Sequence, residues 1–305
     1  MKGTQILRGL GGHEYRFETD RTALLHQGKF SVGYRGKDQE GLPVFIKRLK
    51  GDFPPREAEM PARHPALVAL RDLVRQQNEV YLIYPFVEGL TLRQFLRAGA
   101  GGLGRREEEL LAVFRDICQG LEAMHQAGWY HGDLKPQNIL LLFCDGKIGG
   151  ARVIDFGKAS PFYRASEPAG DFPLVYAAPE MILGAYTLVD ARSDVYSLGL
   201  LLYETIGGQR PYHHEHPELL IQMMLNLPLP PDPVLAPELN GLLQRSTAKP
   251  VFGIPPVQMQ EDEKIAVLQE AIGRRPESAG AFLDTLLALK GNLRRKMKWW
   301  ELLFR

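Results

Sequence analysis

The chain reads His-Gly-Asp-Leu-Lys-Pro-Gln-Asn from residue 131 to residue 138, and Asp-Phe-Gly from residue 155 to residue 157. These two segments bring carboxylates, an ammonium group and a side-chain amide close together in the sequence. Phosphoryl transfer from a nucleotide needs a carboxylate near the acceptor hydroxyl, a cation on the moving phosphate and hard oxygen ligands for Mg²⁺. The first candidates for chemistry are therefore Asp133, Lys135, Asn138 and Asp155.

Composition is that of an ordinary globular protein, and 305 residues favour about two domains. The 37 basic residues nearly cancel the 36 acidic ones, so net charge gives no reason to expect nucleic acid as a partner. The two cysteines, Cys118 and Cys144, are expected to be buried free thiols, which suits a reducing compartment. No apolar run is long enough for a signal peptide or a membrane span, so the expected location is the cytoplasm.

The first ninety residues favour strands. Segments 42–49 and 80–87 are rich in apolar and β-branched residues, and the first of them carries Lys47. Between these two segments, Asp52 and the prolines after it predict a short helix of about two turns that ends at Pro61.

Beyond residue 89 the apolar period changes from two to about three and a half. The pattern predicts a long helix that ends at Gly128, a hairpin around Asp145 and Gly146, and a buried helix over 193–206. We therefore expect an N-terminal β-rich lobe over 1–89, an α-rich lobe over 90–290 and a basic, aromatic tail over 291–305.

Five motifs occur in a fixed order and together resemble the eukaryotic-like (Hanks-type) Ser/Thr protein kinases, in a style typical of bacteria. The resemblance covers about 25–249 and implies an α+β, two-lobed kinase fold. The motifs are Phe45-Ile46-Lys47, the 131–138 segment, Asp155-Phe156-Gly157, Ala178-Pro179-Glu180 and the 193–199 segment Ser-Asp-Val-Tyr-Ser-Leu-Gly.

This resemblance assigns roles to the first candidates. It implies that Asp133 orients the acceptor hydroxyl and takes its proton, and that Lys135 neutralises the transferred phosphate. Asn138 and Asp155 are the expected metal ligands, for Mg²⁺ with Mn²⁺ as an alternative. ATP is the expected phosphoryl donor, and Asp194 is expected to hold the backbone of the catalytic loop.

The N-terminal lobe is expected to hold the nucleotide. Lys47 would contact the α- and β-phosphates, held by Glu57, with Glu59 as the alternative partner. The backbone at Pro85 and Val87 would meet adenine, with Tyr84 beside the inner pocket.

The glycine-rich loop departs from the family. Only Gly28 stands at an expected glycine, His26 and Ser31 replace the other two, and Gly33 takes the place of a usual valine. This puts nucleotide affinity in doubt, although Gly28 stays a candidate for phosphate binding.

The activation segment departs as well. Gly132 replaces the arginine that commonly pairs with an activation-loop phosphate, no threonine occurs between Lys158 and Ala177, and Pro173 stands near a usual threonine. Together these changes predict activity without activation-loop phosphorylation. The arginine that usually pairs with Glu180 is also missing from its place just after Lys249, so Glu180 needs another partner.

Two other functions fit parts of the sequence. His-Gly-Asp also begins the catalytic loop of aminoglycoside- and choline-kinase-like enzymes, which phosphorylate small molecules. A pseudokinase, which keeps the fold without turnover, would suit the poor glycine-rich loop. Against both stand the complete set of catalytic residues and the long activation segment, which suits a protein acceptor.

The tail places basic residues beside Trp299 and Trp300. Docking on the large lobe is the first expectation for it, and a membrane-surface or partner contact through 293–305 is the second. Nothing in the sequence names the protein substrate.

Overall fold

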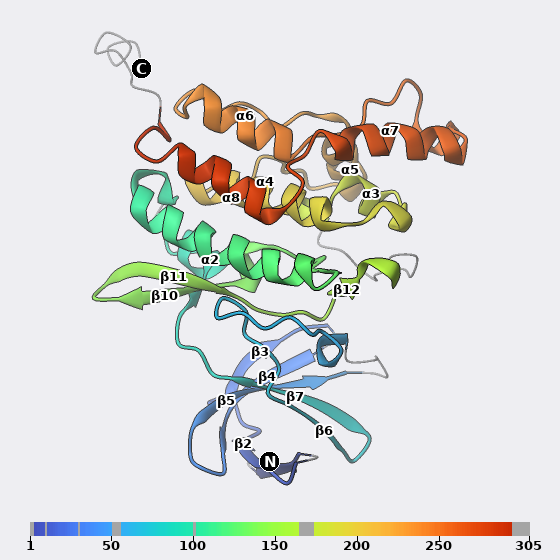
Figure 1. Ribbon diagram of the computed structural model, residues 1–305. Helices are drawn as coiled ribbons and strands as arrows, with labels where there is room; N and C mark the ends of the chain where they lie inside the picture. Colours follow the sequence, from blue (N-terminus) through green and yellow to red (C-terminus); the bar gives the residue numbers. More distant parts are fainter. Residues whose placement is uncertain are drawn as a thin grey trace. The chain divides into compact units, whose positions relative to one another are not determined.

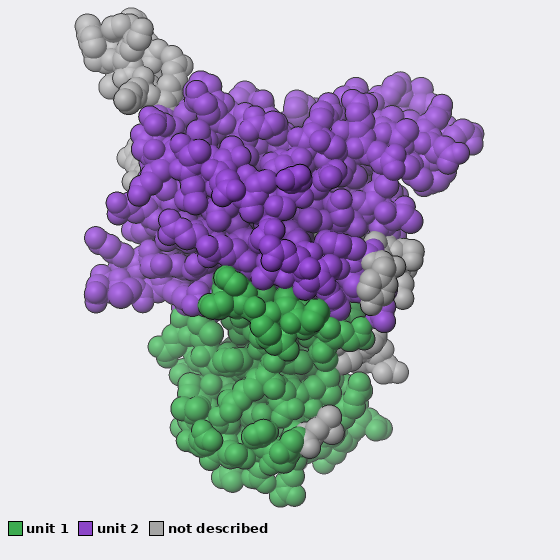
Figure 2. Space-filling view, viewed as in Figure 1, with its two compact units in different colours: residues 1–88 green, residues 89–305 purple. Residues whose placement is uncertain are grey.

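The computed structural model describes residues 3–9, 11–29, 31–50, 56–99, 102–164 and 174–294. The chain divides into two compact units, Met1–Glu88 and Gly89–Arg305 (Figure 2). The activation segment between residues 165 and 173, including Pro173, and the tail from residue 295 onward lie outside the described residues.

The first unit is a curled antiparallel sheet with the strand order β1-β2-β4-β5-β7-β6, to which β3 is added at β4 (Figure 1). The sheet curls far enough for β6 to meet β1, where Gln76 Nε2 donates to the carbonyl of Ile6 at 3.0 Å. Its strands are β1 (Thr4–Arg8), β2 (Glu14–Glu18), β3 (Leu24–Gln27), β4 (Ser31–Asp38), β5 (Pro43–Leu49), β6 (Asp72–Gln76) and β7 (Glu79–Pro85).

The inner face of this curled sheet is the core of the unit. Strand residues that alternate inward pack together and exclude water, as the period of two requires. The core side chains are Leu7, Tyr15, Phe17, Val32, Tyr34, Val44, Ile46, Val74, Tyr81 and Ile83. Lys47 alternates with Ile46 on β5 and therefore lies on the opposite face.

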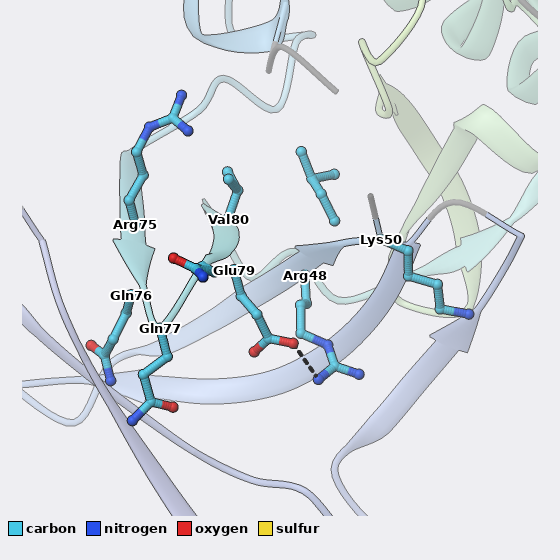
Figure 3. A pocket seen from close by; sticks show the side chains of 9 residues that line it. Arg48, Lys50, Arg75, Gln76, Gln77, Glu79 and Val80 are labelled. Atoms are coloured by element: carbon cyan, nitrogen blue, oxygen red, sulfur yellow. Dashed lines mark hydrogen bonds and ion pairs between the residues drawn. The ribbon is translucent and has the colours of Figure 1, made fainter. Parts of the chain in front are cut away.

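Where a regulatory helix was predicted, the described residues contain one short 3₁₀ turn, η1 (Arg56–Ala58). Residues 51–55, in which that helix was expected to begin, lie outside the described residues. Also in the first unit, the end of β5 and the β6–β7 hairpin border an open hollow of about 880 Å³ (Figure 3). Two of its cations are engaged, because Arg48 pairs with Glu79 at 2.9 Å and Lys50 donates to the Gly28 carbonyl at 2.8 Å.

The second unit is mainly helical (Figure 1). Helix α2 packs on β11 and α8, and α4 packs on α6. The helices are α1 (Leu92–Arg97), α2 (Glu107–Gln126), α3 (Pro179–Ile182), α4 (Ala191–Gly207), α5 (Pro217–Asn226), α6 (Pro237–Ser246), α7 (Glu261–Gly273) and α8 (Ala279–Ala288). The strands are β8 (Leu90–Thr91), β9 (Trp129–Tyr130), β10 (Ile139–Cys144), β11 (Lys147–Val153) and β12 (Ser160–Pro161), and further 3₁₀ turns include η3 (Pro136–Asn138) and η5 (Leu174–Tyr176).

Helix α4 is the centre of this unit. Asp190 caps its first turn by accepting from the Arg192 N–H at 2.7 Å, and Gly208 ends it in the left-handed conformation. Nearly every side chain along α4 is buried, as the sequence predicted from its all-round apolar character.

Two smaller expectations have different outcomes. Cys118 on α2 is buried, and burial raises the pKa of its thiol, whereas Cys144 is exposed. The prediction of two buried thiols is therefore wrong for Cys144, because β10 reaches solvent at its hairpin end. No helix within the described ranges is both long enough and apolar enough to cross a membrane.

The beginning of the tail docks on the second unit. Leu293 is buried, its carbonyl accepts from the Ala236 N–H at 3.0 Å, and Arg294 Nε donates to the Gly104 carbonyl at 2.7 Å. The aromatic part of the tail, with Trp299 and Trp300, falls outside the described residues.

Candidate active site

One buried carboxylate, that of Asp194, anchors the backbone of the 131–138 loop. Asp194, in the first turn of α4, accepts from the N–H of His131 at 2.7 Å and from the N–H of Gly132 at 3.0 Å. His125 Nε2 lies 2.9 Å from the same carboxylate. Burial disfavours the charged form of Asp194, but the hydrogen bonds and charge from His125 and His131 outweigh it and hold its pKa below the usual range. The expected anchoring role of Asp194 is confirmed.

Gly132 is a glycine for a local reason. Its φ is +70°, in the left-handed region that disfavours side chains. A Cβ at this position would also lie 3.0 Å from the Tyr130 ring and 3.1 Å from the Lys158 carbonyl. The backbone at this point therefore favours glycine over the arginine common in the family.

Asp133 has one engaged oxygen and one that is free. Its Oδ2 accepts from Lys135 Nζ at 2.7 Å and from Asn138 Nδ2 at 3.1 Å. Its Oδ1 is buried and has no hydrogen-bond partner among the described residues, although Lys158 Nζ lies 3.9 Å away. A fixed carboxylate with one unbonded oxygen is suited to accept a hydroxyl proton.

Asn138 and Asp155 provide oxygens that fit a hard cation. Asn138 uses Nδ2 on the carboxylate and the carbonyl of Asp133, so its amide oxygen is left as an acceptor. The Asn138 carbonyl accepts from the Ile154 N–H at 2.9 Å, which brings Asp155 close to Asn138. Asp155 is exposed and has a φ of +64°, while Phe156 beside it is buried against the ring of His131. One amide oxygen and one carboxylate match the donor set that Mg²⁺ prefers.

In the first unit, Lys47 is paired with the carboxylate that the sequence favoured. Its Nζ lies 2.7 Å from Glu57 Oε1, and both side chains are largely buried. The pair forms although η1 is a single 3₁₀ turn, because β5 and η1 bring the two residues together without a longer helix. Glu59, the alternative partner, is exposed, whereas Glu57 is buried.

The β3–β4 connection is tight. The Gly28 N–H donates to the Ser31 carbonyl at 2.9 Å, and the Gly28 carbonyl accepts from Lys50. In this conformation the Gly28 N–H is engaged within the hairpin and does not point to a ligand. Phosphate binding by Gly28 therefore stays a prediction that requires the loop to open.

The segment after β7 offers a free backbone edge. Pro85 is exposed and pairs in register with Val44, and Tyr84 before it is buried. Among the described residues no hydrogen bond is made by the backbone N–H or C=O of Val87. Those two groups form the donor and acceptor pair that a purine base requires.

Comparison with known proteins agrees with this geometry. The family model described as "Protein kinase domain" matches residues 22–294. The chain belongs to the protein kinase family. The chain is 34% identical over 222 residues to the serine/threonine-protein kinase PknB of Mycolicibacterium smegmatis, and the match covers 68% of this chain and 33% of that protein.

Two Streptomyces coelicolor proteins are also similar to this chain. Identity is 29% over 307 residues with the probable serine/threonine-protein kinase SCO3848, covering 92% of this chain and 43% of that protein. Identity is 31% over 272 residues with the serine/threonine-protein kinase PkaB, and the match covers 82% of this chain and 62% of that protein. The chain thus spans between about a third and three fifths of the length of these relatives.

Glu180 has a partner that the sequence did not predict. Arg275 donates to both oxygens of Glu180, at 2.6 and 2.9 Å, and Ser193 Oγ donates to one of them at 2.7 Å. Arg275 comes 26 residues after Lys249, and the 3₁₀ turn η7 (Pro256–Gln258) and helix α7 lie between them. The Arg-Pro pair at 275–276, just before the last helix, is the sequence signal that could have located it.

A second buried cluster fixes the end of the activation segment. Arg93 on α1 donates to Glu204 on α4 at 2.7 Å and to the Tyr176 hydroxyl at 2.6 Å, and that hydroxyl donates to Glu204. Burial and the neighbouring Glu204 raise the pKa of Tyr176, so it stays a neutral donor. This cluster anchors η5 to the core of the second unit, and no local sequence pattern indicates it.

Proposed function

We propose that this chain is an ATP-dependent protein kinase that phosphorylates serine and threonine hydroxyls of proteins. The observation that carries the proposal is the arrangement at Asp133. One carboxylate oxygen is held by Lys135 and Asn138, and the other is buried and free to receive a proton. A binding module without turnover has no need of such an arrangement.

Each residue has a physical task in this mechanism. Asp133 orients the acceptor hydroxyl through Oδ1 and accepts its proton as the oxygen attacks. Lys135, already held in place by Asp133, offers its ammonium to the charge that develops on the transferred group. Lys47, fixed by Glu57, binds the α- and β-phosphates of ATP.

Asn138 and Asp155 would hold Mg²⁺, or Mn²⁺ in its place. When bound, the ion supplies positive charge that offsets the charge of the phosphates. Asn138 also donates to Asp133, so the same side chain would align the base with the metal position.

Activation without phosphorylation of the activation loop is part of this proposal. An arginine at position 132 would be needed to bind a loop phosphate, but the φ of +70° favours glycine there. The ion pair Lys47–Glu57 is formed, and the loop is anchored by Asp194, without any phosphate. We further propose a cytoplasmic location for the catalytic unit, in line with its free thiols.

The test is transfer of label from γ-labelled ATP to generic serine- and threonine-containing proteins, with Mg²⁺ or Mn²⁺. We expect label on wild type that is lost in Asp133→Asn and in Asp155→Asn. The matched control is Asp145→Asn, a change in an exposed turn at φ +50°, where asparagine is equally suited. Acid hydrolysis of the labelled proteins identifies the acceptor residue.

Absence of label on any protein, with ATP binding retained, would overturn the protein-kinase proposal. Turnover of hydroxylated metabolites would then indicate a small-molecule kinase, and no turnover a pseudokinase. Full activity in a protein shown by mass spectrometry to carry no phosphate would support activation without loop phosphorylation.

A further inference from the structure

The loop between β3 and β4 is closed on itself around Gly28. The Gly28 N–H donates to the Ser31 carbonyl at 2.9 Å, and the Gly28 carbonyl accepts from Lys50 Nζ at 2.8 Å. A Cβ built on Gly28 would fall 2.7 Å from Nε2 of His26, so the imidazole lies against the α-carbon. The donor, the acceptor and the α-carbon of this glycine are therefore all engaged within the first unit.

Lys50 reaches the loop from the end of a neighbouring strand. The pairing of β4 with β5 ends where Ser31 is opposite Leu49, and Lys50 is the next residue along the chain. Strand β3 pairs with the other edge of β4. The Lys50 side chain therefore crosses the end of β4 to reach the Gly28 carbonyl. In Figure 3 this side chain is directed away from Glu79 and the β6–β7 hairpin.

This hydrogen bond ties a short loop to a fixed strand. Its donor is an ammonium group, and hydrogen bonds of charged groups are about twice as strong as those of neutral groups. Lys50 and Gly28 are both half-buried, so water competes with the bond less than it would on an open surface. Strand β5, which ends just before Lys50, is itself paired with β4 on one side and β7 on the other. The loop therefore opens less often than it would if only its own turn hydrogen bond held it.

We propose that Lys50 is a latch that holds the β3–β4 loop closed and thereby limits the affinity for ATP. The inference rests on the proposed function, in which this loop contributes to phosphate binding. The Gly28 N–H is engaged in the closed loop, so the loop must open before that group can reach a phosphate. The apparent dissociation constant then equals the intrinsic constant divided by the fraction of molecules whose loop is open. Lys50 acts through Gly28, and it is therefore a positioning residue.

The first measurement follows opening of the loop without any nucleotide. Hydrogen exchange of the Gly28 amide, recorded by NMR on the full chain, reports how often its bond to Ser31 breaks. In Lys50→Met this exchange should become about tenfold faster, which is the lower end of the effect of a hydrogen bond to a charged group, because the pair is only half-buried. Lys50→Arg keeps a cationic donor and should exchange at close to the wild-type rate. Lys29→Met is the matched control, because it removes a cation from the same loop and leaves Lys50 in place.

The second measurement is the affinity of Mg·ATP for the same four proteins. Lys29→Met shows how much a cation near the loop contributes by attraction to the phosphates alone. Lys50→Met loses the same charge and also the latch, so it should bind ATP up to about tenfold more tightly than Lys29→Met. Lys50→Arg should bind as wild type does. Thermal unfolding of each variant without ligand separates these effects from a general loss of fold.

The outcomes distinguish the latch from the proposed function. If wild type transfers phosphate from ATP but Lys50→Met matches Lys29→Met in both amide exchange and ATP affinity, the latch is overturned and the proposed function stands. Weaker ATP binding by Lys50→Met than by Lys29→Met would also overturn the latch, because Lys50 would then hold the loop in the form that binds. If wild type and Lys50→Met both fail to bind ATP or to transfer its phosphate, the proposed function is overturned, whereas faster Gly28 exchange in Lys50→Met would still support the role of Lys50 in closing the loop.

Discussion

Removing Arg275 should destabilise the second unit strongly, because it leaves a buried charge without its partner. Arg275 and Glu180 are both fully buried, with no exposed side-chain surface on either. Arg275 makes two hydrogen bonds to Glu180, contacts the carbonyls of Arg192 and Ala248, and lies 5.0 Å from the ring of Tyr196. In Arg275→Met the Glu180 carboxylate keeps one side-chain donor among the described residues, Ser193.

Breaking a buried ion pair on one side costs about 3–5 kcal/mol. The complete burial of both groups and the bidentate geometry favour the upper part of that range. For a domain of this size each kcal/mol lowers the Tm by about 2–4 °C, so Arg275→Met should unfold about 6–20 °C below wild type.

The assay is thermal unfolding followed by circular dichroism, with Arg274→Met as the neighbouring control. Arg274 is exposed and donates one hydrogen bond to the Lys249 carbonyl, so its loss should lower the Tm by no more than a few degrees. The double variant Glu180→Leu with Arg275→Met removes both charges and should regain much of the lost stability. If Arg275→Met unfolds within about 2 °C of Arg274→Met, the reasoning about the buried charge is refuted.

Three further predictions concern the same unit. Gly132→Ala should lose about 1–2 kcal/mol of unfolding free energy, because alanine disfavours a φ of +70°. Gly149 has no such φ, so Gly149→Ala is the control and should not show this loss. Equal unfolding curves for the two variants would contradict the prediction. Burial lowers the pKa of Lys249 to about 7, so between about pH 7 and 10.5 the folded state binds fewer protons than the unfolded state, and the free energy of unfolding should rise with pH across that window. In urea titrations Lys249→Met should lose this dependence on pH. An unchanged slope would refute the assignment. Asp194 has a folded pKa below its unfolded value, so its stabilisation is present above about pH 4 and is lost as pH falls through the folded pKa. The free energy of unfolding of Asp194→Asn should therefore fall less steeply with acid than that of wild type. Identical acid curves for the two proteins would count against this role.

Local sequence signals predicted the elements that carry the chemistry. Strand β5 with Lys47, helix α2, helix α4 and the β10–β11 hairpin follow from period and turn chemistry alone. The hairpin is a clear case, because Asp145 and Gly146 both take positive φ, as the Asp-Gly pair indicates. The family itself was predicted from the order of its motifs and is confirmed by the match over 22–294.

What the sequence could not provide depends on contacts between distant residues. Arg275 pairs with Glu180 across a separation of 95 residues, and α7 lies between Lys249 and Arg275. The bond from Lys50 to Gly28 depends on the register of β4 against β3 and β5, which sets which groups meet. The regulatory helix was predicted at about two turns, and the described part of that segment holds only η1.

The separation of Glu180 and Arg275 has a consequence for how the chain is made. At about 5–20 residues per second, a ribosome adds Arg275 roughly 5–19 s after Glu180. For the later part of that interval, after Gly207 has been added, Ser193 and the rest of α4 are synthesised, but the carboxylate still lacks the cation that allows its burial. The nascent catalytic unit therefore has to keep Glu180 hydrated and its activation segment open until α7 has been synthesised, and the last part of the chain controls when the first complete kinase fold can form.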